Sequence, residues 1–171
     1  MKRMSLVWVF LLCTPFLFAG DIDQVFKKWQ KEFAQTEGIK WENHVATPQE
    51  QERLREDSGI EDLQVKQGTT FEVSDAAILS TIKKDLATVQ VKAPFVEIFN
   101  KTIDQSRLVV IGQKSGSNWT KAYVVMVQGN EGGGAVIEGQ LTDAAYKQHV
   151  EESIQMLDQM FTMMSMMSQK K

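Results

Sequence analysis

The stretch "RLVVIGQKSGSNWTKAYVVMVQGNEGGGAVIEGQL", residues 107–141, decides the fold class. It contains three apolar runs, which are separated by two segments rich in glycine, serine and asparagine, residues 114–118 and 129–134. Runs of this length between such segments are typical of β-strands joined by hairpin loops, in which the glycines supply positive φ angles. The stretch therefore predicts a three-stranded antiparallel meander.

The middle run of this meander is apolar at successive positions, from Ala122 to Val127. Such a run is expected of a central strand that is buried on both faces, which predicts that both faces of the sheet are covered. Trp119 directly follows the first loop, so we expect an exposed aromatic ring at a binding edge.

Helices and further strands are predicted upstream. Residues 21–38 carry apolar side chains on one helical face, and Trp29 belongs to that face and hence to the core. Residues 39–45 read as a short strand. Thr47 and Pro48 begin a polar surface helix, as a cap and a first helical residue. The segment 60–73 predicts a hairpin with its turn at Gln67 and Gly68.

Two more helices are expected before the meander and one after it. Ser74 would cap the first, Pro94 would begin a short one that runs to Ile103, and Thr142 would cap a long C-terminal helix. These elements together predict an α+β fold. Its antiparallel sheet, a hairpin plus a three-stranded meander, packs with an N-terminal helix, central helices and the long C-terminal helix in a single domain, residues 21–171.

Residues 1–20, "MKRMSLVWVFLLCTPFLFAG", have the layout of a secretory signal peptide. Two basic residues precede an apolar run that is short for a membrane span, and Ala19 and Gly20 are the small residues expected at the cleavage site. Cleavage there predicts a periplasmic or secreted protein with no transmembrane segment in the mature chain.

Export also restricts the chemistry. The only cysteine, Cys13, lies in the leader, so a mature chain has neither disulfides nor thiolate ligands. Of 19 basic residues Lys2 and Arg3 are removed, which leaves 17 against 22 acidic residues. An acidic chain of this kind does not attract nucleic acid or an anionic membrane.

The start "DIDQVFKKW", residues 21–29, the meander and the terminal helix together resemble a bacterial family of small exported proteins, the domain of unknown function 4252. The resemblance implies an exported α+β protein. It brings no established activity, and the methionine-rich tail is not part of the family's pattern.

Catalytic chemistry has little support. The two histidines, His44 and His149, lie in no nucleophile motif and are too few for a zinc site built on histidine. The glycine-rich loop at 129–134 connects two strands and does not open a helix, which argues against phosphate binding. We therefore expect no enzyme activity and no cofactor.

The C-terminal segment "MLDQMFTMMSMMSQKK", residues 156–171, has six methionines within twelve residues. On a helix, a docking stripe that includes Leu157 and Phe161 uses one side. The methionines at 156, 160, 163 and 167 form a second stripe about 90° away.

Three interpretations of this second stripe remain open. It packs within the domain or against a second copy, because methionine fills irregular gaps. It binds an envelope protein or peptide, with Met156, Met160, Met163, Met167 and Trp119 as the contact residues. Alternatively it captures Cu(I), because thioether sulfur is a soft ligand, with Met160, Met163, Met164 and Met167 as ligands. Partner binding or self-association is the predicted function, and Cu(I) binding is the alternative.

Overall fold

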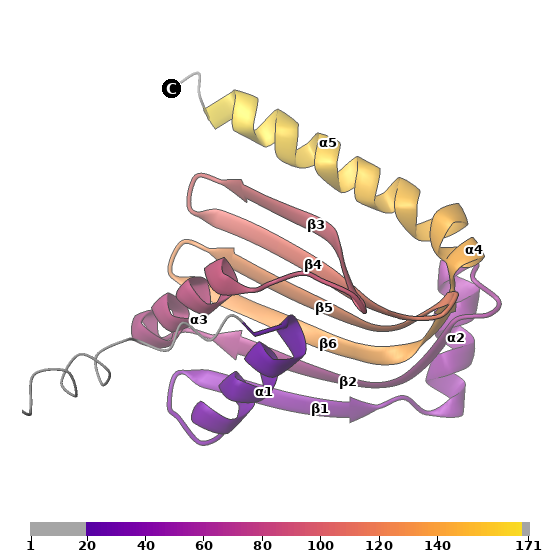
Figure 1. Ribbon diagram of the computed structural model, residues 1–171, viewed down its shortest axis with the longest axis horizontal. Coiled ribbons are helices and arrows are strands. Elements are labelled where there is room, and N and C mark those ends of the chain that lie inside the picture. The colour runs from indigo at the N-terminus through magenta and orange to yellow at the C-terminus, as the bar shows by residue number, and fades with distance from the viewer. Residues whose placement is uncertain (1–19, 169–171) are drawn as a thin grey trace, which may run out of the picture.

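A computed structural model describes residues 20 to 168, with side chains as far as Met163. It has an α+β fold, in which six antiparallel strands form one sheet in the order β1-β2-β6-β5-β4-β3 (Figure 1). Among residues 20 to 168, no helix is both long and apolar enough to cross a membrane. The elements are α1 (Ile22–Glu32), β1 (Ile39–Val45), α2 (Pro48–Ser58), β2 (Gln64–Val73), α3 (Ala76–Thr88), β3 (Phe95–Ile103), β4 (Ser106–Ser115), β5 (Asn118–Gln128), β6 (Glu131–Thr142), α4 (Asp143–Ala145), the π-helical turn η1 (Tyr146–Val150) and α5 (Glu151–Ser168).

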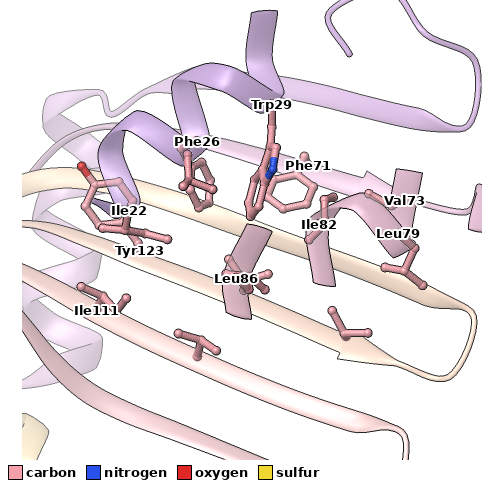
Figure 2. Close-up of a cluster of buried hydrophobic side chains, with 14 of the residues drawn as sticks. Ile22, Phe26, Trp29, Phe71, Val73, Leu79, Ile82, Leu86, Ile111 and Tyr123 are labelled. Atoms are coloured by element: carbon pink, nitrogen blue, oxygen red, sulfur yellow. The ribbon is translucent and has the colours of Figure 1, made fainter. Parts of the chain in front are cut away.

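Helices α1 and α3 lie on one face of the sheet and cover its core (Figure 1). Phe26 and Trp29 of α1 meet Phe71 of β2 with ring centroids 5.6 and 5.8 Å apart (Figure 2). Trp29 is fully buried, as its place in the helical pattern predicts, and its Nε1 donates to Asp85 of α3 at 2.8 Å. This face, which we call the core face, is closed by apolar packing.

The helix starts follow from local capping. Asp21 caps α1 by accepting from the backbone N–H of Gln24. The predicted cap Thr47 is confirmed at α2, where it forms a capping box with Glu50. Helix α2 has no buried residue, which confirms the predicted surface helix. At α3 the cap is Asp75 and not Ser74, because the Asp75 carboxylate accepts from two backbone N–H groups.

The meander of β4, β5 and β6 is confirmed, but the predicted hairpin in residues 60–73 is wrong. Residues 64–73 form a single strand, β2, in which Gly68 lies between His44 of β1 and Ile137 of β6. The local sequence does not show which strands pair with this segment, so a glycine here is interpreted as a turn residue. Within the sheet Gly68 is an ordinary extended residue, because β1 and β6 pair with β2 on its two sides.

The predicted helix after Pro94 is also wrong, since residues 95–103 form β3. Its apolar residues are spaced as on a helix, but the cause is a register shift between Glu97 and Phe99. A bulge of this kind moves the following side chains to the other face of the strand and breaks the period of two. Phe95 therefore packs in the core, whereas Phe99 packs against α5.

Most glycines of the 129–134 loop do not have the predicted positive φ. Gly129 has φ 58° in the β5–β6 turn, but Gly132, Gly133 and Gly134 lie inside β6. A Cβ on Gly134 would come within 2.5 Å of the Val124 carbonyl oxygen and 2.7 Å of the Phe71 ring. Glycine is thus needed there for close approach.

The second face of the sheet is only partly covered. Tyr123, Val125 and Val127 of β5 are buried on the core face, whereas Met126 on the second face is 46% exposed. The prediction that β5 is buried on both faces is therefore wrong. The reason is the position of α5, which packs on the edge strand β3 and leaves the far part of β5 open.

Candidate functional site: the methionine flank of the terminal helix

Helix α5 is fixed to the sheet by one side. Phe161 packs edge-on against Phe99 of β3, with ring centroids 5.4 Å apart. Lys101 of β3 forms an ion pair with Asp158 at 2.5 Å and donates to Thr162 at 3.2 Å. Thr142 caps the chain's entry into this helical segment, as predicted, by accepting from the Ala145 N–H at 3.2 Å. The helix thus runs along β3 at the rim of the sheet (Figure 1).

The other side of α5 carries the methionine flank, which we define as Met156, Met160 and Met163. These side chains are 60%, 52% and 54% exposed. Gln155 and Gln159 line the hollow of about 430 Å³ between α5 and β3. The helical positions of the methionines turn them away from both this hollow and the sheet. The flank is therefore an apolar stripe that the described part of the domain does not cover.

Two members of the predicted copper set fall within this flank. Met160 and Met163 are one helical turn apart and both exposed, so their sulfur atoms are open to a soft metal ion. The side chains of Met164 and Met167 lie outside the described part. Within residues 20 to 168, no group of three or more His, Asp or Glu side chains is arranged to hold a metal ion.

Trp119 does not form the exposed edge that its sequence position predicts, because it is 9% exposed. A register shift between Trp119 and Lys121 turns the indole onto the second face, where it lies over Gly112. Its ring stacks on Tyr146 of η1 with centroids 4.4 Å apart, and its Nε1 donates to Asp143 at 3.1 Å. Trp119 thus anchors the root of the terminal helix.

Asp143 is the polar hub of this root. Its carboxylate pairs with Lys114 at 2.6 Å and with Lys147 at 3.4 Å. The hydrogen bond from Lys114 is the main reason why the pKa of Asp143 lies below its usual value. The same Lys114 ammonium lies 4.6 Å from the centre of the Trp119 ring, a cation–π contact.

A second polar cluster lies on the core face, and the sequence offered no motif for it. Asp23 of α1 accepts from the Tyr123 hydroxyl at 2.7 Å and faces Lys121 at 3.5 Å. Lys121 also pairs with Glu138 at 2.8 Å, and Glu138 accepts from Gln67 at 2.8 Å. Three strands and α1 meet in this cluster. A signal was present in the sequence, because charged residues at 121 and 138 interrupt otherwise apolar strands.

The pKa values in this cluster follow from its contacts. Burial alone would raise the pKa of Asp23, but hydrogen bonds from Lys27 and Tyr123 and the charge of Lys121 outweigh it and lower the pKa. The hydrogen bond from Lys121 lowers the pKa of Glu138. Burial, together with the bond to Asp23, raises the pKa of the Tyr123 hydroxyl. The cluster is therefore a set of paired charges that fastens α1 to the sheet.

No family model, no curated protein and no solved structure matches this chain. The resemblance to the domain of unknown function 4252 therefore stays a prediction.

Proposed function

We propose that this chain is a non-catalytic accessory protein of the bacterial cell envelope, which binds an envelope protein or peptide, or a second copy of itself, through the methionine flank. The exposure of Met156, Met160 and Met163 on one side of an otherwise docked helix carries this proposal. Methionine-rich faces adapt to varied apolar surfaces because the side chain is unbranched and polarizable. Three such side chains in register on a helix are suited to a helix-in-groove contact.

The electrostatics support a role without catalysis. A carboxyl that serves as a general acid at neutral pH needs a raised pKa. Within the described residues, each carboxyl with a resolved shift, including Asp23, Glu138 and Asp143, has a lowered pKa because of cationic or hydrogen-bonding partners. His44 lies 3.1 Å from Glu50 in an exposed position. Lowered pKa values of this kind favour paired structural charges over a general acid, which supports the proposal.

The test places a photo-cross-linking residue at Met160 in the full chain, expressed in its own host. Gln155 is the matched control, because it is exposed but lies on the side of α5 that lines the hollow against β3. We expect one discrete adduct from position 160 and none from 155, and an adduct of twice the chain mass would indicate self-association. The adduct should disappear when Met156 and Met163 are replaced by Gln. Equal adducts from both positions would contradict the proposal.

Folding of the Met156→Gln, Met160→Gln, Met163→Gln variant separates surface binding from packing. Because the three side chains are more than half exposed, the thermal midpoint should stay within a few degrees of the parent. A collapse of the midpoint would mean that the flank is a structural contact of the domain itself.

The predicted location belongs to the same proposal. We expect the exported protein to begin at Gly20 or Asp21, which N-terminal sequencing of the protein from the periplasm or the medium would reveal. An N-terminus at Met1 in the mature protein would contradict export by cleavage.

Cu(I) binding is a second candidate, favoured by the shared exposure of Met160 and Met163. Its test is a Cu(I) titration against a chromophoric competitor under reducing conditions. The control replaces Met160, Met163, Met164 and Met167 by Leu, which keeps the apolar volume and removes the sulfur. Binding that vanishes in this variant would establish a copper site, and absence of binding in both would remove the copper hypothesis.

A further inference from the structure

A cavity of about 220 Å³ lies at the root of the terminal helix, between the second face of the sheet and the helical segment. Tyr146, Val150 and Ile154 follow one another at intervals of four residues and form its helical wall. The first two belong to the π-helical turn η1, a type of turn that is frequent at functional sites. Ala122 and Val110 line it from the central strands.

The cavity opens to solvent at Ile137. This side chain lines the cavity and is 40% exposed, whereas Trp119, which also lines it, is only 9% exposed. The methionine flank does not line the cavity. The cavity is therefore separate from the methionine flank, on which the proposed function depends.

The surface that lines the cavity is almost entirely apolar, although Gln64, Gln140 and Tyr146 also border it. Three further polar groups at the walls are engaged elsewhere. The Trp119 Nε1 donates to Asp143, Lys121 pairs with Glu138, and the Thr120 hydroxyl donates to the Gln113 carbonyl at 3.3 Å. A peptide backbone inserted here would have to leave its N–H and C=O groups without partners, at a cost for each group. A hydrocarbon has no such groups, so this wall favours a hydrocarbon over a peptide.

The dimensions suit a linear chain. A cavity of about 150 Å³ takes up benzene, so about 220 Å³ has room for roughly nine carbon atoms. From Ala122 the apolar side chains of Val124 and Met126 continue along the second face of β5, over roughly 13 Å. Met126 also borders a larger hollow with the charged residues Lys40 and Glu72 at its rim. This row of side chains on β5 thus has the apolar cavity at one end and the charged rim of the larger hollow at the other.

We propose that this cavity binds the terminal carbons of a linear alkyl chain, as carried by a fatty acid or a monoacyl lipid. The remaining carbons lie along Val124 and Met126, and the polar head lies near the hollow at the far end of β5. This adds a ligand site to the chain that the proposed function does not require.

The experiment titrates the purified protein with hexanoate, octanoate, decanoate and dodecanoate by calorimetry, below the concentrations at which they aggregate. We expect saturable one-to-one binding that tightens by roughly fourfold for each added methylene until the cavity is filled, with smaller gains beyond. A monoacylglycerol with the same alkyl chain tests whether the ligand is a fatty acid or a neutral monoacyl lipid. Because Lys40 is already paired with Glu42 at 2.5 Å, the neutral and the anionic head should bind within about threefold of each other.

Ala122→Phe fills the cavity from its floor and should weaken dodecanoate binding by at least about tenfold. Val45→Phe, on the exposed edge strand β1 where Val45 is 70% exposed, is the matched control and should bind as the parent does. Ile137→Lys places a charge at the mouth and should weaken binding similarly, and its partial exposure keeps the test valid if Ala122→Phe does not fold.

The variant with Met156, Met160 and Met163 replaced by Gln should bind dodecanoate as the parent does, which separates this site from the methionine flank. Affinity that does not depend on chain length, or that is equal in the parent, Ala122→Phe and Ile137→Lys, would overturn the proposal. Absence of saturable binding in the parent would overturn it as well, while the cross-linking result for the methionine flank would be unaffected.

Discussion

At the scale of single residues, Gly112 decides how the terminal helix begins. A Cβ at this position would lie 2.3 Å from Cζ3 of Trp119 and 2.9 Å from Cδ1 of Ile98. The Trp119 ring lies where a side chain at 112 would have been, and Tyr146 stacks on that ring. The missing side chain on β4 is therefore what lets the indole pack flat on the sheet and hold η1.

Gly112→Ala should lower the free energy of unfolding by about 1–3 kcal/mol, because the added methyl group overpacks the contact with Trp119. Gly68→Ala is the control, a glycine in the middle of β2 whose Cβ would meet only the Val136 carbonyl oxygen at an ordinary 3.7 Å. Urea denaturation followed by tryptophan fluorescence measures both. Equal effects of the two substitutions would show that Gly112 is not specifically required by the indole.

At the scale of elements, α5 has one side that stabilises the fold and one that does not. Phe161 packs against the buried Phe99, whereas its neighbour Met160 is 52% exposed. Phe161→Ala should therefore reduce stability by about 1–2 kcal/mol more than Met160→Ala. Chemical denaturation of the two variants measures this difference. If Met160→Ala proved as damaging, the methionine flank would be a packing surface and the proposed function would lose its support.

The elements also show what local sequence determines. The meander, α1, α2 and the Thr142 cap were predictable because their periodicity and capping residues are local. Residues 60–73 and 95–103 were not, because Gly68 has the same local signature in a turn and in a strand, and the bulge after Glu97 imitates helical spacing. Only pairing with distant strands resolves both cases.

The candidate site was predictable to a similar extent. Helical periodicity placed Met156, Met160 and Met163 away from the docking side, and in the structure these side chains are more than half exposed. Trp119 was misplaced because its orientation depends on a register shift that no local pattern reveals. The cavity at the root of α5 could not be foreseen, since its walls come from strands and a helical turn that are distant in the sequence.

At the scale of the whole molecule, the Asp23 cluster joins α1 to the middle of the sheet. Its carboxylates have pKa values below those of an unfolded chain, about 3.9 for Asp and 4.3 for Glu. The unfolded state then binds more protons in the acid range. The stabilisation is fully present above the unfolded pKa values and is lost as the pH falls through the folded ones.

The Asp23 cluster also limits stability at alkaline pH, because the pKa of its Tyr123 hydroxyl is shifted upward and not downward. Burial, and then the bond to Asp23, raises the pKa of Tyr123 above the unfolded value of about 10. Its contribution is present below that value and is lost as the pH rises through the folded one. We therefore expect a broad stability plateau from about pH 5 to about pH 9, with losses on both sides.

The double variant Asp23→Asn, Glu138→Gln tests whether the carboxylates of this cluster cause the loss of stability at acid pH. It should lose about 1–3 kcal/mol at neutral pH, because hydrogen bonds to charged groups become neutral ones, and its stability should fall less steeply below about pH 4. Glu152→Gln, which changes an exposed carboxylate on α5, is the control. Urea midpoints across the pH range give the slopes. A variant with the parent's slope would mean that other carboxylates cause the acid loss, and the link between α1 and the sheet would then depend on its apolar contacts.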